Sequence, residues 1–203
     1  MRQTIIALCL FATCLWMAGD APAQDWPCYG GPNHNGAIDD AAVAPDPKAM
    51  AALWKAPMLG RGFSGLAVVD GKVFFLDRRG TGDAGQDVLR VLELATGKAL
   101  REYSHLAPGD TDEDKTGLRA RTGPVSVPTV TATHVYFAGA KGVLYCIDRR
   151  THRLAWKRDL RVSLNWKVYS LSRLLIDDLV VVSGTLEEGG DMGKAFRAAD
   201  GDP

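Results

Sequence analysis

The sequence predicts an all-β protein, an incomplete β-propeller built from four-stranded antiparallel blades. The first observation is repetition: a group of four short strand patterns joined by turn residues occurs twice in the 203-residue chain and begins a third time. The second is that the middle strands of these groups, residues 73–76, 143–147 and 180–182, are continuous apolar runs. Such strands are buried on both faces, whereas the strands of a two-sheet sandwich alternate apolar and polar positions. Four-stranded sheets of this kind, repeating at roughly 45 to 55 residues, indicate propeller blades.

The repeats give each blade definite bounds. We expect one blade at 63–103, a second at 124–160 and an incomplete third at 170–203. An acidic residue marks the end of the third strand in each blade. These residues, 55 and 52 positions apart, are Glu93, Asp148 and Asp200.

The N-terminus has the features of a secretory signal peptide. Arg2 supplies a positive charge, residues 5–17 form an apolar run, and Ala21-Pro22-Ala23 is a small-x-small cleavage site. The run is too short to span a bilayer, which needs about 20 apolar residues. We therefore expect residues 1–23 to be removed and the mature chain from Gln24 to be exported, to the periplasm or the extracellular space, without a transmembrane segment.

The chain has four cysteines, two on each side of the expected cleavage site. Cys9 and Cys14 lie in the signal peptide. Acylation of Cys14 would make a lipoprotein, but the residues before it match the lipoprotein pattern poorly. Cys28 and Cys146 remain, either as a disulfide formed in an oxidising envelope or as two small buried side chains. The second interpretation is favoured, because one cysteine lies in an N-terminal segment and the other in a strand.

Charge argues against one class of partner. The 24 basic and 24 acidic residues give a formal net charge of zero. Without a net positive charge, the chain lacks the electrostatic attraction that drives binding to nucleic acid or to anionic membranes.

Four long insertions form the predicted partner-binding surface. They occupy 78–87, 104–123, 160–169 and 185–194, either between the second and third strands of a blade or between blades. In an antiparallel blade both kinds of connection emerge at the same end. Their eight basic and nine acidic residues suit a protein or a glycan better than nucleic acid. The candidate partner-binding residues are Arg78, Arg79, Asp112, Arg119, Arg121, Trp166 and Lys167.

The motifs predict no catalytic residue, metal site or cofactor. Residues 110–114 resemble the first half of a calcium-binding loop, but Lys115 and Arg121 stand where glycine and glutamate are needed, which favours a solvated acidic loop. The four histidines have no metal-like spacing. No Gly-x-Ser-x-Gly motif of a hydrolase precedes a helix.

Two sets of motifs resemble a known repeat family. Residues 25–33, Asp-Trp-Pro-Cys-Tyr-Gly-Gly-Pro-Asn, resemble the opening of secreted bacterial β-propellers with pyrroloquinoline-quinone-like (PQQ-like) repeats. Residues 92–98 and 144–156 resemble the Leu-Asp-x-x-Thr-Gly-x-x-x-Trp signature of that repeat. The resemblance covers nearly all of 25–203. It implies the propeller fold and is nearly silent on chemistry.

The resemblance implies two alternative functions. The favoured one is a binding or scaffolding module of the cell envelope that is not an enzyme, as in the non-catalytic branch that includes the lipoprotein subunit of the outer-membrane β-barrel assembly machinery. The alternative is a fragment of a quinoprotein oxidoreductase, which would bring PQQ and Ca²⁺. Quinoproteins hold the quinone between a tryptophan and a disulfide of adjacent cysteines, and this chain has no adjacent cysteines.

The sequence departs from the family pattern at four positions. Gly30 replaces an arginine of the opening, which we expect to change how that segment is anchored. Arg101 replaces the tryptophan of the first blade, and Arg173 replaces a proline of the third, so we expect these two blades to be looser. His152 stands where the turn has glycine, and histidine is one of the few other residues that tolerate positive φ.

The two ends of the repeat array predict an arc that does not close. Residues 24–51 are an extension and linker, and 52–203 are the propeller segment. Within it, residues 52–57 around Trp54 align with the fourth strand of a blade, although no first three strands precede them. The third blade stops before its fourth strand. Because only two complete blades lie between these pieces and a ring needs at least about four, we expect residues 24–203 alone to be marginally stable and to self-associate.

Overall fold

The computed structural model describes residues 24–38, 51–60, 62, 64–80, 85–105, 124, 126–139, 143–159, 173–183 and 193–203. Strands in these ranges form three antiparallel sheets, which we name blades A, B and C. Blade A contains β1 (Ala67–Val69), β2 (Lys72–Arg79), β3 (Gln86–Glu93) and β4 (Ala99–His105). Blade B contains β5 (Thr129–Val130), β6 (His134–Ala138), β7 (Val143–Asp148) and β8 (Arg153–Asp159). Blade C contains β9 (Arg173–Ile176), β10 (Leu179–Ser183) and β11 (Gly193–Arg197).

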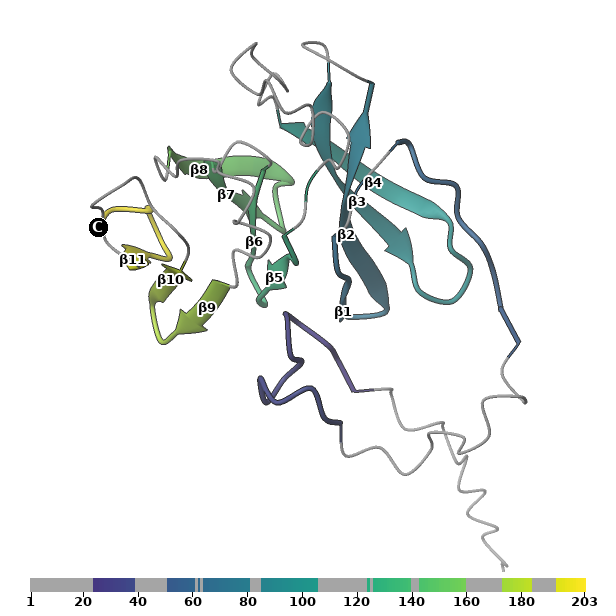
Figure 1. The fold of residues 1–203 in the computed structure, drawn as a ribbon, viewed down its shortest axis with the longest axis horizontal. Helices are drawn as coiled ribbons and strands as arrows, with labels where there is room; N and C mark the ends of the chain where they lie inside the picture. Colours follow the sequence, from purple (N-terminus) through teal and green to yellow (C-terminus); the bar gives the residue numbers. More distant parts are fainter. Residues whose placement is uncertain are drawn as a thin grey trace, which may run out of the picture.

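The blades follow one another in an arc that does not close, as Figure 1 shows from blade A on the right to blade C on the left. In each blade the strands pair with their neighbours in chain order. Their first strands lie along the inside of the arc, because β5 neighbours both β1 and β9. The prediction of an all-β, incomplete propeller with four-stranded antiparallel blades is confirmed.

The middle strands are buried on both faces, as the apolar runs predict. Along β2, Val73 and Phe75 point to one side of blade A, whereas Phe74 and Leu76 point to the other, and all four are buried. A strand that contacts a neighbouring layer on both sides has no position at which a polar side chain reaches water. This explains the absence of alternation in the sequence.

Two apolar layers hold the blades together. Between blades A and B, Phe74, Leu76 and Leu89 pack against Val135 and Phe137. Between blades B and C the layer consists of Tyr136, Ala138, Leu144, Cys146 and Trp156 of blade B with Val180, Val182 and Phe196 of blade C. Each such side chain, when buried, contributes roughly 1.5 to 3 kcal/mol.

The third repeat is offset from the expected alignment. In the turns of blades A and B, Gly97 donates its backbone N–H to the carbonyl of Glu93, and His152 donates to that of Asp148. In blade C the equivalent bond runs from Gly201 to Arg197. Arg197, and not Asp200, therefore ends the third strand of blade C. The alignment of Asp200 with the acidic pair is wrong, because Asp200 lies in the turn that follows β11.

Residues 51–60 form an extended segment that the structure does not place in a sheet, in contrast to the strand expected at 52–57. The segment crosses the side of blade A that faces away from blade B. There Trp54 and Ala56 pack against Val73, Phe75 and Leu92. The segment thus covers an apolar side of a blade without a ladder partner in the described residues.

The N-terminal segment 24–38 is anchored by its backbone. Trp26 exchanges two backbone hydrogen bonds with Val68 of β1, and Pro27 O accepts from Val130 N of β5. The segment therefore ties the inner strands of blades A and B together. Because these bonds belong to the main chain, they do not need the arginine that Gly30 replaces. The expected signal peptide, 1–23, lies outside the described residues.

Candidate functional site

The long connections leave the blades at one end. Arg79 of β2 is paired with Gln86 of β3, and Asp87 is paired with His105 of β4, so the connections after β2 and β4 begin side by side. The same holds where β8 ends at Asp159. We call this the insertion-bearing end. At the opposite, turn-bearing end, short turns at 70–71, 94–98, 131–133, 149–152, 177–178 and 198–202 join the strands or follow them.

The structure describes two of the candidate partner-binding residues. Arg79 is exposed at the end of β2, where its guanidinium pairs with Glu102 and donates to Ser104 Oγ at 3.1 Å. Arg78 was predicted to lie in a loop, but it belongs to β2 and is only 2% exposed. The strand pairing continues to Arg79, which shortens the first insertion and makes Arg78 a core residue. The other five, Asp112, Arg119, Arg121, Trp166 and Lys167, lie outside the described residues.

A buried ion pair lies next to Arg79. The carboxylate of Asp77 is fully buried, and its Oδ2 is 3.1 Å from Nη1 of Arg90. It also accepts backbone N–H bonds from Leu59 at 2.7 Å, Gly60 at 3.2 Å and Arg78 at 2.8 Å. Four donors thus fill the acceptor positions of one carboxylate. Groups of the fold itself therefore occupy the acceptor positions of Asp77.

Arg90 extends this network toward the surface. Its Nη1 donates to the carbonyl of Pro57 at 2.7 Å, and its Nε lies 3.3 Å from Oε1 of Glu102. The guanidinium also lies over the ring of Phe75, 5.4 Å from the centroid. Asp77 and Arg90 together fasten residues 57–60 to blade A, so their chemistry serves the fold.

At the turn-bearing end, tryptophans dock onto glycine turns. The indole N–H of Trp54 donates to the carbonyl of Leu94 at 2.7 Å, and that of Trp156 donates to the carbonyl of Ala198 at 3.1 Å. Each indole lies directly on a glycine of the same turn: a Cβ added at Gly97 or Gly201 would come within 2.4 or 2.7 Å of the ring. Glycine is therefore required wherever a tryptophan docks.

The junction between blades A and B lacks this docking. Arg101 occupies the position that Trp156 has in blade B, and His152, at φ 59°, replaces the glycine. The positive φ predicted for His152 is confirmed. The His152 Nδ1 and the Tyr103 hydroxyl are hydrogen-bonded at 2.8 Å. Arg101 instead turns its Nη1 to the carbonyl of Leu100, within its own strand, at 2.8 Å.

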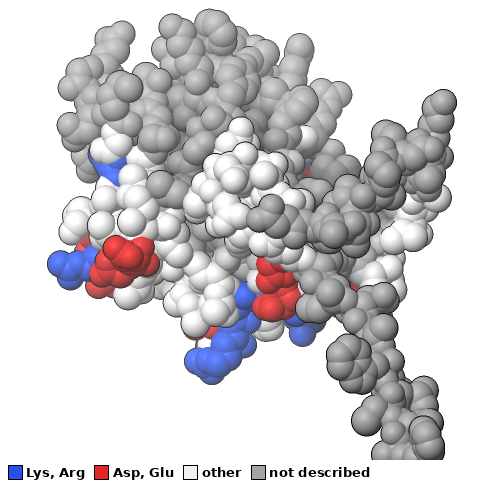
Figure 2. All heavy atoms as spheres, turned by 90° about the horizontal axis from the view of Figure 1, so that it is seen from below, with Lys and Arg blue, Asp and Glu red and all other residues white. Residues whose placement is uncertain are grey.

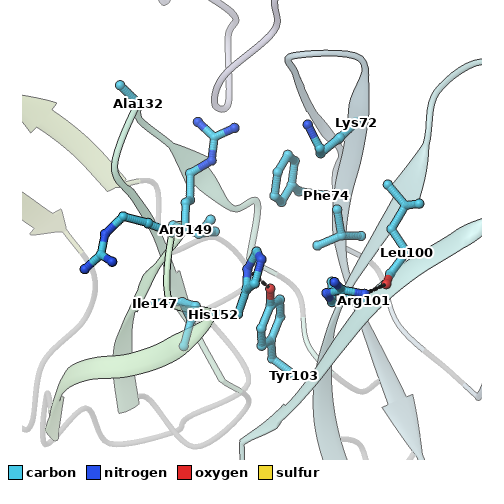
Figure 3. A pocket seen from close by; sticks show the side chains of 12 residues that line it. Lys72, Phe74, Leu100, Arg101, Tyr103, Ala132, Ile147, Arg149 and His152 are labelled. Atoms are coloured by element: carbon cyan, nitrogen blue, oxygen red, sulfur yellow. Dashed lines mark hydrogen bonds between the residues drawn. The ribbon is translucent and has the colours of Figure 1, made fainter.

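A pocket of about 480 Å³ opens at this junction. Figure 3 shows Arg101 and Phe74 on the blade A side and His152 on the blade B side, with the Tyr103–His152 hydrogen bond between the sheets. Its basic lining residues are Lys72, Arg101, Arg149, Arg150 and His152, its other lining residues are Phe74, Val91, Leu100, Tyr103, Ala132, Val135 and Ile147, and none is acidic.

One of the basic residues already has a carboxylate partner. Arg149 of blade B pairs with Asp70 of blade A at 2.6 Å, donates to the carbonyl of Thr131, and lies 5.7 Å over the Phe74 ring. Figure 2 views the molecule from below and shows basic and acidic groups next to one another on the described part of that side. Burial raises the pKa of Tyr103, and the charge of Arg101 partly offsets this rise.

Tyr145 and Cys146 are titratable groups within the apolar layers. Burial raises the pKa of Cys146 to about 12, and it raises that of Tyr145 to about 12 with a further contribution from the charge of Asp87. Cys28 and Cys146 are both buried free thiols. Within the described ranges, no group of three or more His, Cys, Asp or Glu side chains is placed to hold a metal ion. Nor do those ranges contain a helix long and apolar enough to cross a membrane.

Comparison with known proteins supports the propeller architecture. No protein-family model and no curated protein matches the sequence. A europium-containing methanol dehydrogenase is 14% identical, with a TM-score of 0.50 over 74% of this chain and 26% of that one. The quinohemoprotein alcohol dehydrogenase ADHIIG of Pseudomonas putida HK5 is 22% identical, with a TM-score of 0.47 over 73% of this chain and 21% of that one. BamB from Moraxella catarrhalis is 13% identical, with a TM-score of 0.30 over 68% of this chain and 55% of that one.

The likeness to the methanol dehydrogenase shows the fold alone. The chain spans about a quarter or less of the two dehydrogenases. Blades A to C therefore have the architecture of a segment of a β-propeller. At these identities, what the dehydrogenases bind or catalyse does not carry over to this chain.

The sequence identified Arg101 and His152 as separate departures from the repeat and did not bring them together. The signal was present in the spacing. Arg101 lies 55 residues before Trp156, and His152 lies 55 residues after Gly97, so both halves of one tryptophan–glycine contact are replaced at the same junction.

Proposed function

We propose that this chain is an exported propeller module that binds a macromolecular partner through its insertion-bearing end and does not catalyse a reaction. The observation that carries the proposal is the strand register, which brings the long connections after β2, β4, β8 and β10 to one end of the blades. Connections on a rigid scaffold are the usual place for binding residues, because they vary without disturbing the core.

The chemistry next to these connections supports binding over catalysis. Asp77 is saturated with hydrogen-bond donors, and Arg90 is shared between Asp77, Pro57 O and Glu102. Arg79 and Glu102, which reach the surface, form an ion pair of opposite charges. A surface with both signs of charge suits a protein or glycan partner.

Export is the second part of the proposal, and it rests on the features of residues 1–23. N-terminal sequencing of the chain from an envelope fraction is expected to begin at or near Gln24. An uncleaved chain in the cytosol would contradict export.

Partner binding is tested by removing one insertion. The tagged chain is cross-linked in an envelope fraction, and the captured proteins are compared with those of a variant in which residues 107–122 are replaced by a short glycine linker. We expect the variant to keep the strand signal in circular dichroism and to lose the captured partner. Lys98→Gln, in a turn at the opposite end, is the matched control and is expected to capture the same partner as the wild type.

Equal capture by the wild type and the deletion would refute the proposed surface. A separate assay addresses the quinoprotein alternative: PQQ and Ca²⁺ are added to the purified chain, and dye reduction is followed with alcohols or sugars. We expect no dye reduction above a control without protein. Turnover that depends on both additions would favour the oxidoreductase instead.

A further inference from the structure

We propose that the pocket between blades A and B, at the turn-bearing end, is a binding site for a small aromatic carboxylate. This site is separate from the proposed partner surface, because it lies at the opposite end of the blades. Its volume of about 480 Å³ lies within the usual range for small-molecule sites, roughly 300 to 1,000 Å³.

The pocket lies at a blade junction that lacks the matched tryptophan and glycine of the neighbouring junctions. At the two neighbouring positions an indole fills the corresponding space, with Trp54 on Gly97 and Trp156 on Gly201. Between blades A and B, Arg101 turns to its own strand and His152 bonds with Tyr103. Arg101 and His152 thus replace the tryptophan and the glycine of the repeat. Neither side chain fills the space that the tryptophan ring would occupy.

The apolar wall of the pocket selects the body of the ligand. Phe74, Val91, Val135 and Ile147 line it from both blades and continue into the apolar layer between them. The accessible part of the lining is mostly apolar and gains free energy when a flat apolar group covers it, and the half-buried Tyr103 presents a ring for aromatic contact. A neutral sugar or an inorganic anion would gain less from this apolar lining.

The basic residues select the charge of the ligand. Arg101 uses one of its five N–H donors on Leu100 O, and Arg150 forms no side-chain hydrogen bond or ion pair within the described ranges. The Lys72 ammonium donates to the carbonyl of Asp70 at 3.2 Å. Among the described residues, Lys72, Arg101 and Arg150 form no ion pair with a carboxylate, although the charge of Arg150 helps to lower the pKa of Asp148, and no acidic residue lines the pocket. A guanidinium matches a carboxylate with two parallel hydrogen bonds.

The ligand class is tested on the full chain by calorimetric titration with phenylacetate. Phenylacetamide, which has the same shape without the charge, and inorganic phosphate, which has charge without the ring, are the ligand controls. We expect phenylacetate to bind at least tenfold more tightly than either control. Equal binding of the amide would overturn the role of the cations, and equal binding of phosphate would overturn the role of the apolar wall. No heat with millimolar phenylacetate would overturn the site altogether.

Two variants locate the binding. Arg101→Gln removes one cation and is expected to weaken phenylacetate binding by roughly tenfold, as the loss of a charged hydrogen bond does. The double variant Arg101→Trp with His152→Gly restores the docking of the neighbouring junctions and is expected to abolish binding while raising the melting temperature. Arg79→Gln, an exposed arginine at the other end, is the matched control and should bind as the wild type. Wild-type affinity in the refilled double variant would place the ligand elsewhere and overturn the proposal.

Discussion

Asp77 shows how a buried charge is used at the scale of one residue. A fully buried carboxylate is stable only when it is paired and hydrogen-bonded, and Asp77 has both Arg90 and three backbone N–H donors. Because two of these donors belong to residues 59 and 60, the carboxylate connects an extended segment to β2. Its contribution is to the fold, through a contact far from its own position in the chain.

Asp77→Ala is therefore expected to lower the free energy of unfolding by about 3–5 kcal/mol, because it leaves Arg90 buried without its main partner. The measurement is urea unfolding followed by circular dichroism. Asp202→Ala breaks the exposed pair with Arg158 and serves as the control, with an expected loss of about 0–1 kcal/mol. Equal losses in the two variants would show that burial does not set the value of these pairs.

Alanine substitutions at Gly71 and Gly97 distinguish the cost of backbone strain from the cost of displacing a docked tryptophan. Gly97 and Gly71 both have positive φ, 71° and 65°, but a Cβ meets the Trp54 ring at Gly97 and has nothing within 4 Å at Gly71. Gly71→Ala is expected to cost about 1–2 kcal/mol from the left-handed backbone alone. Gly97→Ala should cost about 1–3 kcal/mol more, because the indole must move. Thermal unfolding of both variants checks this, and identical melting temperatures would contradict the docking.

At the scale of the element, β6 and β7 concentrate groups that must remain uncharged. Tyr136 lies on β6, Tyr145 and Cys146 lie on β7, and burial raises the pKa of all three. Each group favours its neutral form in the fold. Below the ordinary pKa values, 9.0 for cysteine and 10.0 for tyrosine, the folded and unfolded chains carry the same protons on these groups.

Stability should consequently fall in alkali. As the pH rises above 9.0, the unfolded chain loses protons that the folded chain retains up to a pKa of about 12, so unfolding becomes more favourable across that window. Urea unfolding at a series of pH values measures the slope. Tyr145→Phe removes one of the three groups and should make the fall shallower, whatever its effect at neutral pH. Constant stability up to the upper end of the window would contradict the burial of these groups.

Elements buried on both faces were the most predictable part of the fold. Runs such as 73–76 and 143–147 have no polar positions, so their composition and length alone identify them as strands that are buried on both faces. The turn at Asp177–Asp178, where Asp177 has φ 52°, likewise follows from two adjacent residues of a type that favours turns. These features depend only on residues adjacent in the sequence.

The errors fall where the structure depends on residues far apart. Arg78 looked like a loop residue because a charge rarely ends a buried strand, but the ladder from Arg79 to Gln86 extends β2 past it. Asp200 was aligned by its charge, whereas hydrogen bonding in the turn places Arg197 at that position. The pocket depends on distant residues as well: Arg101 and His152 line one pocket because blades A and B pack together.

At the scale of the whole molecule, the stacking of blades explains both the stable interior and the exposed side. Each of the layers between A and B and between B and C buries apolar residues from two sheets. Blade A also has residues 51–60 on its other side, where Trp54 and Ala56 pack against it. On blade C, Val180 and Val182 face blade B, whereas Ile176 and Leu179, which are paired across the ladder, point to the opposite side.

That opposite side of blade C is the basis for a prediction about self-association. Ile176 is 47% and Leu179 38% exposed, and an apolar sheet face of this kind lowers its free energy by stacking on another copy. We expect the chain to form oligomers in light scattering, and we expect Ile176→Glu with Leu179→Lys to shift it toward the monomer. Leu154→Lys changes a leucine that is 41% exposed on β8, away from this face, and is the matched control. If the wild type is already monomeric, or if Leu154→Lys dissociates the oligomer as well as the double variant does, this side of blade C is not the contact.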